Sequence, residues 1–152
     1  MGLDTLLLAV GESDTDRLEQ LAATTTDIAA PNDTEVNLAH IFTEEEYETA
    51  RENLDFDDFS EVTPDVTAKR YTTIRELRDA MEEAGVEYRV LGRTNPDADI
   101  GSEVVSVAED VDADMVVTGG RKRSPAGKAV FGSTAQKVLM NAPCPVTFVR
   151  SE

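Results

Sequence analysis

Five short apolar segments separated by four amphipathic stretches constrain the fold of this chain more than any other feature. The apolar segments are dominated by β-branched and other apolar residues and lie at 3–10, 35–42, 87–91, 114–118 and 145–150. Several of them lack a clean alternation of polar and apolar residues. This pattern indicates strands that are buried on both faces, as in a parallel sheet covered by helices.

The stretches between these segments carry apolar residues at helical spacing. The four stripes are Leu18, Leu21, Ala22, Thr25, Ile28 and Ala29; Tyr71, Ile74, Leu77, Met81 and Ala84; Ile100, Val104, Val107, Ala108 and Val111; and Ala135, Val138, Leu139 and Ala142. The order β-α-β-α-β-α-β-α-β with right-handed crossovers predicts an α/β fold, a single doubly wound five-stranded parallel sheet with helices on both faces. Ligands of such sheets bind at the carboxyl ends of the strands, where the strand order reverses.

The length of 152 residues suits one domain spanning residues 1–152. One stretch, residues 43–65, departs from the alternation, because it holds ten acidic residues and a single base, Arg51. We expect it to form an acidic surface excursion that is mobile, carries a short helix and is pinned to the body by its aromatic residues. A lid over a ligand is the second interpretation.

The chain is strongly acidic, with 31 Asp and Glu against 14 Lys and Arg and a net charge of −17. A folded domain of this charge repels itself unless salt screens it, which predicts a halophilic host and disfavours nucleic acid as a partner. The apolar run at residues 6–10 is too short to span a membrane and predicts a buried strand. The lone Cys144 has no partner for a disulfide, which fits the cytoplasm.

The segment 119–134 carries the clearest chemical signal. A predicted buried strand ends in Gly119 and Gly120, and Gly132-Ser133-Thr134 opens a helix after the loop. Backbone N–H groups, hydroxyls and the positive end of a helix dipole then converge, as an anion site requires. Four bases, Arg121, Lys122, Arg123 and Lys128, lie within eight residues that contain no acid. The alternative is a basic face that is merely solvated.

The spacing fits neither a Walker A loop nor G-x-G-x-x-G. It resembles the nucleotide loop of the universal stress protein family, in which Gly-x-x-Gly is followed by nine residues and then Gly-Ser or Gly-Thr. Gly119 matches the first glycine and Gly132-Ser133 the closing pair, whereas Lys122 stands at the second glycine and Gly11 at an aspartate that usually ends the first strand. The resemblance extends to residues 39–41, 113–117 and 141–146. Together with the acidic composition, it implies a member of the family of the haloarchaeal type.

The resemblance implies a five-stranded doubly wound fold, a homodimer paired through the last strand from Val146 to Val149 and, in one branch of the family, bound ATP. The implied cofactor is ATP or another adenine nucleotide, with or without Mg, and adenine would lie beside Ala9, Val10, Gly11 and Ile41. The phosphates would lie against Thr118, Gly119, Lys122, Gly132, Ser133 and Thr134, with charge added by Arg121 and Arg123.

The remaining reactive side chains favour structural interpretations. His40, the only histidine, is interpreted as packed or hydrogen-bonded within the fold, and Cys144 as a small apolar residue. The carboxylates at 44–46 and at 55, 57 and 58 are interpreted as solvated surface. Since no acid–base pair stands out, we expect no catalytic residues, no metal ligands and at most slow ATP hydrolysis.

Two functions stay open at this point. The first is a dimeric stress-response protein that binds ATP or a related adenine nucleotide and acts through its conformation or its partners. The second is an adaptor module that binds no nucleotide. A third, an ATP-cleaving ligase or pyrophosphatase of similar topology, would require a Ser-Gly-Gly loop after the first strand, and Val10-Gly11-Glu12-Ser13 lacks it.

Overall fold

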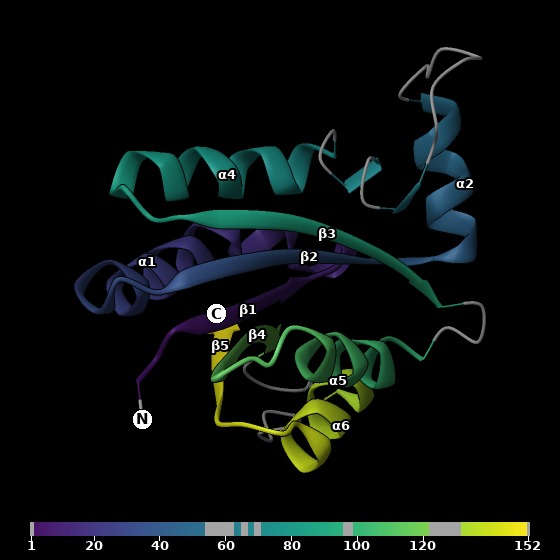
Figure 1. The fold of residues 1–152 in the computed structure, drawn as a ribbon. Helices are drawn as coiled ribbons and strands as arrows, with labels where there is room; N and C mark the ends of the chain where they lie inside the picture. The colour runs from purple at the N-terminus through teal and green to yellow at the C-terminus, as the bar shows by residue number, and fades with distance from the viewer. Residues whose placement is uncertain are drawn as a thin grey trace.

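The computed structural model describes residues 2–53, 63–64, 67–68, 71–95, 99–121 and 132–151. Five parallel strands form one sheet in the order β3-β2-β1-β4-β5 (Figure 1). In chain order the strands are β1 (Thr5–Val10), β2 (Glu35–Thr43), β3 (Tyr88–Asn95), β4 (Met115–Arg121) and β5 (Val146–Ser151). The predicted doubly wound α/β fold is therefore confirmed.

Helices cover both faces of the sheet. In chain order the structure has the 3-10 helix η1 (Glu12–Arg17) and the α-helices α1 (Leu18–Asn32), α2 (Glu44–Asn53), α4 (Thr72–Ala84), α5 (Ile100–Asp110) and α6 (Ser133–Asn141). The helices α1 and α4 pack side by side on one face, and α5 and α6 pack side by side on the other. None of the helices in the described segments is long and apolar enough to cross a membrane.

The central strand β1 supplies side chains to two cores, one on each face. Leu6 and Leu8 join a cluster with residues of α1 and α4, whereas Leu7 and Ala9 join a second cluster with residues of α5 and α6. Both faces of β1 are thus buried in apolar surroundings. This is the physical reason for the unbroken apolar run in the sequence.

Two strands continue further toward their carboxyl ends than the sequence predicted. β3 reaches Asn95 instead of residue 91 because its register with β2 continues to the pair Thr43 and Asn95. Residues 119–121, predicted to begin the phosphate-binding loop, belong to β4 and pair with residues 149–151 of β5. Ladder hydrogen bonds hold Asn95, Gly119 and Gly120 in strands, although asparagine and glycine are rare in strands.

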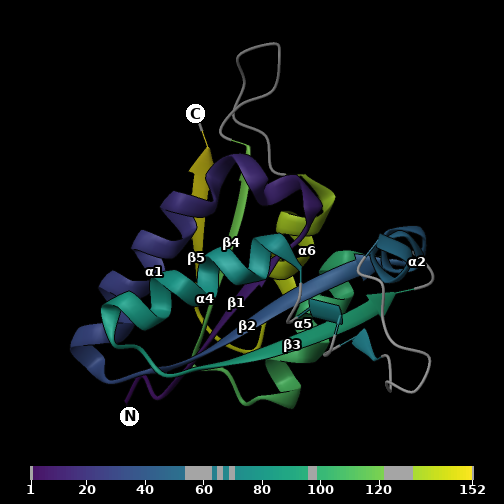
Figure 2. The same cartoon turned by 90° about the horizontal axis from the view of Figure 1, so that it is seen from above.

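The acidic excursion begins with α2, which confirms the predicted short helix at this place. The helix follows β2 directly and stands at the carboxyl end of that strand, away from the helices that cover the sheet (Figure 2). Tyr47 packs against the core on the α1 and α4 side of the sheet. Residues 54–62, which complete most of the predicted excursion, lie outside the described residues.

A polar contact joins the amino-terminal end of α5 to the middle of α6. Asp99 caps α5 by accepting hydrogen bonds from the N–H and the hydroxyl of Ser102, and it accepts a third bond from Lys137 Nζ at 2.8 Å. These bonds, led by that of Lys137, lower the pKa of Asp99 to about 2. A side chain at Gly101 would place its Cβ 2.8 Å from the Cβ of Lys137, so glycine lets the two helices approach.

Candidate functional site

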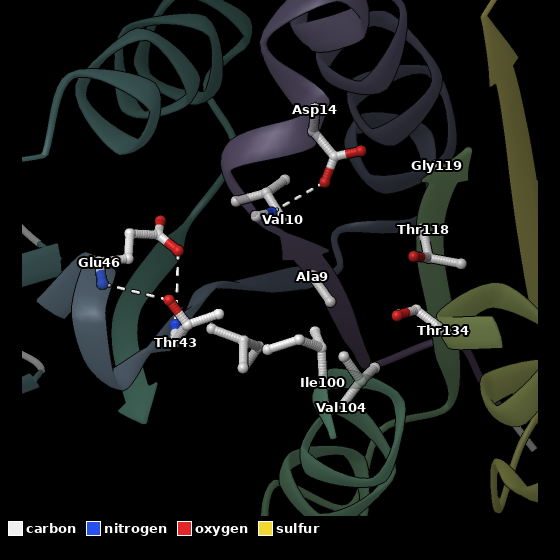
Figure 3. Close-up of a pocket in the computed structure, with 12 residues that line it drawn as sticks. Ala9, Val10, Asp14, Thr43, Glu46, Ile100, Val104, Thr118, Gly119 and Thr134 are labelled. Carbon is white, nitrogen blue, oxygen red and sulfur yellow. Dashed lines mark hydrogen bonds between the residues drawn. The ribbon is translucent and has the colours of Figure 1, made fainter. Parts of the chain in front are cut away.

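A pocket of about 290 Å³ opens at the carboxyl ends of the strands. It lies where the strand order reverses between β1 and β4, since the connection after β1 leads to α1 on one face and that after β4 leads to α6 on the other. The crevice that such a reversal creates is the usual ligand site of a doubly wound sheet. The residues that line it are Ala9, Val10, Gly11, Asp14, Ile41, Thr43, Glu46, Ile100, Val104, Thr118, Gly119 and Thr134 (Figure 3).

The structure brings many of the sequence-predicted site residues together in this pocket. The residues present at its wall are Ala9, Val10, Gly11, Ile41, Thr118, Gly119 and Thr134. Gly132 and Ser133 do not line it but directly precede Thr134 at the start of α6. Arg121 ends β4, and Lys122 and Arg123 lie outside the described residues. That these residues hold a nucleotide stays a prediction.

Apolar side chains from three elements form the middle of the pocket. Ala9 comes from β1, Ile41 from β2, and Ile100 and Val104 from the first turns of α5. Three of them, Ala9, Ile41 and Val104, are almost fully buried by their packing in the second core. A wall anchored in this way is pre-formed and suits a flat apolar group such as an aromatic ring.

The amino-terminal end of α6 lies at one end of the pocket, where Thr134 and Thr118 are neighbours in Figure 3. Gly132 is the N-cap residue and has no side chain to cap the helix, and its carbonyl accepts a hydrogen bond from the N–H of Gln136 at 2.9 Å. The N–H groups of the first turn lack partners within the helix. This end of the pocket therefore offers N–H donors, two hydroxyls and a positive helix dipole to an anion.

Asp14 is a pocket residue that the sequence analysis missed. Its Oδ2 accepts a hydrogen bond from the N–H of Gly11 at 2.8 Å, and its other oxygen accepts one from the buried guanidinium of Arg17. Burial raises the pKa of Asp14, against the opposing effects of the Gly11 N–H and of Arg17. The carboxylate thus reaches the end of β1 from η1 and lies next to Gly11.

Gly119 is required by the close approach of η1. A Cβ at this position would lie 2.6 Å from Cδ of Arg17 and 3.2 Å from Oδ1 of Asp14. Real Cβ atoms do not approach other atoms this closely without displacing them. The glycine therefore leaves space for the Asp14 and Arg17 pair beside β4, a reason that the loop motif alone does not suggest.

The prediction that residues 44–46 are solvated surface is wrong for Glu46. Its side chain is only 10 % exposed, and its Oε1 lies 2.8 Å from Nε2 of His40, which is fully buried. The N–H of Thr43 donates to Glu46 Oε2 at 3.4 Å, and the N–H of Glu46 donates to the Thr43 hydroxyl at 3.1 Å. This reciprocal capping box draws the carboxylate back from solvent onto the end of β2.

His40 has the packed and hydrogen-bonded environment that the sequence analysis expected. Its ring centroid lies 4.2 Å from that of Phe42 and 4.5 Å from that of Tyr71, and its Nε2 meets Glu46. Cys144 packs against the second apolar core, and burial together with Asp114 raises the pKa of its thiol. Within the described segments, no group of three His, Cys, Asp or Glu side chains is placed to hold a metal ion.

The sequence matches the model of the universal stress protein family over residues 2–150. Two universal stress proteins are similar to it in sequence. That of Mycolicibacterium smegmatis is 29% identical over 86 residues, which are 57% of this chain and 65% of the relative. That of Methanothermobacter thermautotrophicus is 32% identical over 90 residues, which are 57% of this chain and 59% of the relative. The chain thus spans less than two thirds of either relative.

Solved structures with the same fold include a universal stress protein from Archaeoglobus fulgidus, with a TM-score of 0.69 and 24% identity over 97% of this chain and 98% of that one. A universal stress protein in complex with cAMP has a TM-score of 0.69 and 18% identity, and both chains are covered completely. A universal stress protein from Archaeoglobus fulgidus in complex with dAMP has a TM-score of 0.66 and 21% identity over 99% of this chain and 100% of that one. At these identities the likeness shows a shared fold.

Proposed function

The chain belongs to the universal stress protein family, and from this premise we propose that it binds ATP or a related adenine nucleotide. It acts through conformation or partners, as a stress-response protein with no dedicated covalent mechanism and at most slow hydrolysis of the nucleotide. The single observation that carries this proposal is the pocket at the reversal of strand order, in which an apolar slot leads to an uncapped helix N-terminus. A nucleotide has the same two parts, a flat base and an anionic phosphate chain.

The size and lining of the pocket support this assignment. The apolar wall of Ala9, Ile41, Ile100 and Val104 offers a base the dispersion contacts and the exclusion of water that stacking requires. At the other end, Thr118 and Thr134 offer hydroxyl donors to phosphate oxygens. Related proteins of this fold have been solved with cAMP and with dAMP, both of which carry adenine.

Nucleotide that stays bound during purification provides a direct test. The protein is purified in molar KCl and denatured, and the supernatant is separated by chromatography and identified by mass. We expect an adenine nucleotide, at a molar ratio that rises when ATP is added and the unbound excess is removed by gel filtration before denaturation. A protein that yields no nucleotide after this incubation would contradict the proposal and favour the adaptor function, to which the lysine at position 122, where the resemblance implies a glycine, would correspond.

The proposal includes a homodimer formed through β5, the strand at one edge of the sheet. Val146, Thr147, Phe148 and Val149 are each only partly buried, as expected of a strand face that a second copy covers. The N–H of Val116 donates a hydrogen bond to the carbonyl of Pro145, and Val116 pairs with Val146. In this register the backbone N–H and C=O groups of the odd-numbered residues of β5 point toward β4, and those of the even-numbered residues point outward from the sheet edge.

This register selects the substitution that tests the dimer. Arg150→Pro removes an outward-facing N–H and leaves the ladder to β4 intact, so we expect a monomer by light scattering in molar KCl. Thr147→Pro is the contrasting variant, because it removes an N–H that faces β4 and should lower stability instead. A monomeric parent protein, or an Arg150→Pro variant that still dimerises fully, would contradict pairing through this edge.

We also propose that the protein works in the cytoplasm of a halophilic cell. The net charge of −17 supports adaptation to salt, since mutual repulsion of the carboxylates is screened at molar ionic strength, where the Debye length is about 3 Å. The free Cys144 suits a reducing compartment. The midpoint of thermal unfolding should then rise steeply between low and molar KCl, and a flat response would contradict the adaptation to salt.

A further inference from the structure

We propose that Glu46 selects the base of the nucleotide by accepting a hydrogen bond from the exocyclic amino group of adenine. This inference rests on the proposed function and adds to it the residue that distinguishes an amino-bearing base from one without that group. The observations behind it are the carboxylate in the pocket wall, its fixed orientation, and the chemical difference between the two ends of the pocket.

The two ends of the pocket differ in the charge of the ligand group that each can bind. At one end Thr43 and Glu46 approach from the junction of β2 and α2, and at the other Thr118 and Thr134 approach from β4 and α6 (Figure 3). A carboxylate repels a phosphate group, whereas the amino-terminal end of α6 attracts it. Asp14, the other carboxylate of the pocket wall, is paired with the guanidinium of Arg17, which offsets its charge. A nucleotide bound in this pocket therefore directs its phosphates toward Thr134 and its base toward Glu46.

The carboxylate of Glu46 is held in place before any ligand arrives. Nε2 of His40 meets Oε1 at 2.8 Å, and the N–H of Thr43 reaches Oε2 at 3.4 Å. His40 is itself fixed between the rings of Phe42 and Tyr71, at 4.2 and 4.5 Å. A side chain that is supported in this way loses little conformational freedom when a ligand binds, which is what a specificity contact requires.

The carboxylate still has room to accept another hydrogen bond. Its two oxygens offer about four lone-pair positions, and the contact of Oε2 with Thr43 is long, at 3.4 Å. A carboxylate has no donor of its own, so a base must present an N–H group to it. Adenine does so with its 6-amino group. Purine riboside triphosphate has a hydrogen atom there, and binding it would desolvate the carboxylate without giving its remaining lone pairs a donor.

The test compares ATP with purine riboside triphosphate, which keeps the ring, ribose and phosphates and lacks only the amino group. Calorimetric titration of the parent protein should give an affinity for ATP about 10-fold higher. In Glu46→Gln, which retains a partner for His40 and an uncharged acceptor, the ratio should fall to about 3-fold. In Glu46→Ala, which has no acceptor, it should approach one. Glu45→Gln, an exposed neighbour with the same change in charge, should keep the parent ratio.

The outcomes separate this inference from the proposed function. Binding of neither triphosphate by the parent protein would overturn both. If the parent protein binds both triphosphates equally, the role of Glu46 is overturned and the nucleotide site is not. This comparison uses the parent protein alone, so it does not depend on whether the variants fold. A 10-fold ratio that persists in Glu46→Ala would also overturn it, because a purely structural Glu46 would change both affinities equally.

Discussion

Gly132→Val should weaken ATP binding about 100-fold while leaving the fold unchanged. An added Cβ at this position meets no atom within 4 Å, and the backbone angles of φ −62° and ψ 164° suit valine. The branched side chain would stand over the N–H groups at the start of α6 and keep a phosphate away from them. Loss of about two hydrogen bonds to a charged group, each at the lower end of the roughly 1.5–3 kcal/mol that such a bond contributes, costs about 3 kcal/mol and gives this size of effect.

The matched control is Gly132→Ala, which adds a single methyl group at the same place and should produce a smaller loss of affinity. Calorimetric titration of ATP in molar KCl measures all three proteins, and thermal unfolding verifies that each is folded. If the folded valine variant binds ATP as tightly as the parent protein, the phosphate does not lie at the amino-terminal end of α6.

Gly119→Ala should lower the free energy of unfolding by about 1–3 kcal/mol, the usual cost of forcing an extra methyl group into a packed interior. The new Cβ would fall 2.6 Å from Cδ of Arg17, whose side chain is buried and only 6% exposed. Movement of Arg17 would disturb its ion pair with Asp14. Because Asp14 lines the pocket, we expect the affinity for ATP to fall as well.

Gly11→Ala is the control for the loss of stability. Gly11 also lines the pocket, but its added Cβ meets nothing within 4 Å and its extended backbone suits alanine. Its free energy of unfolding, measured by chemical denaturation, should stay within about 0.5 kcal/mol of the parent value. Equal stability of the parent protein and both variants would show that η1 does not pack against β4 as tightly as the structure indicates.

The fold was predictable because one pattern, apolar strands alternating with amphipathic helices, determines it. Leu6, Leu7 and Leu8 form an unbroken apolar run because β1 is covered on both faces, and this signal is local in the sequence. The carboxyl ends of β3 and β4 were not predictable in the same way. Residues 93–95 and 119–121 are strands through pairing with neighbours that are distant in the sequence.

The site was only partly predictable for a related reason. Ala9, Ile41, Thr118 and Thr134 were accessible to sequence reasoning because they follow or end predicted strands or begin a predicted helix, and these places converge in a doubly wound sheet. Asp14 and Glu46 were missed because their roles depend on hydrogen bonds that each side chain accepts from the backbone N–H three residues earlier. The available signals were an acid three residues after Gly11 and the Thr-x-x-Glu capping box at residues 43–46.

The central claim is that an adenine nucleotide binds between the carboxyl ends of β1 and β4, and amide chemical shifts test it most directly. ATP is titrated into the 15N-labelled protein in molar KCl, and the shift of each backbone amide is followed by NMR. The account predicts saturable shifts concentrated at Gly11, Thr118, Gly119 and Thr134. Shifts that are absent at saturating ATP, or that gather away from this pocket, would contradict it.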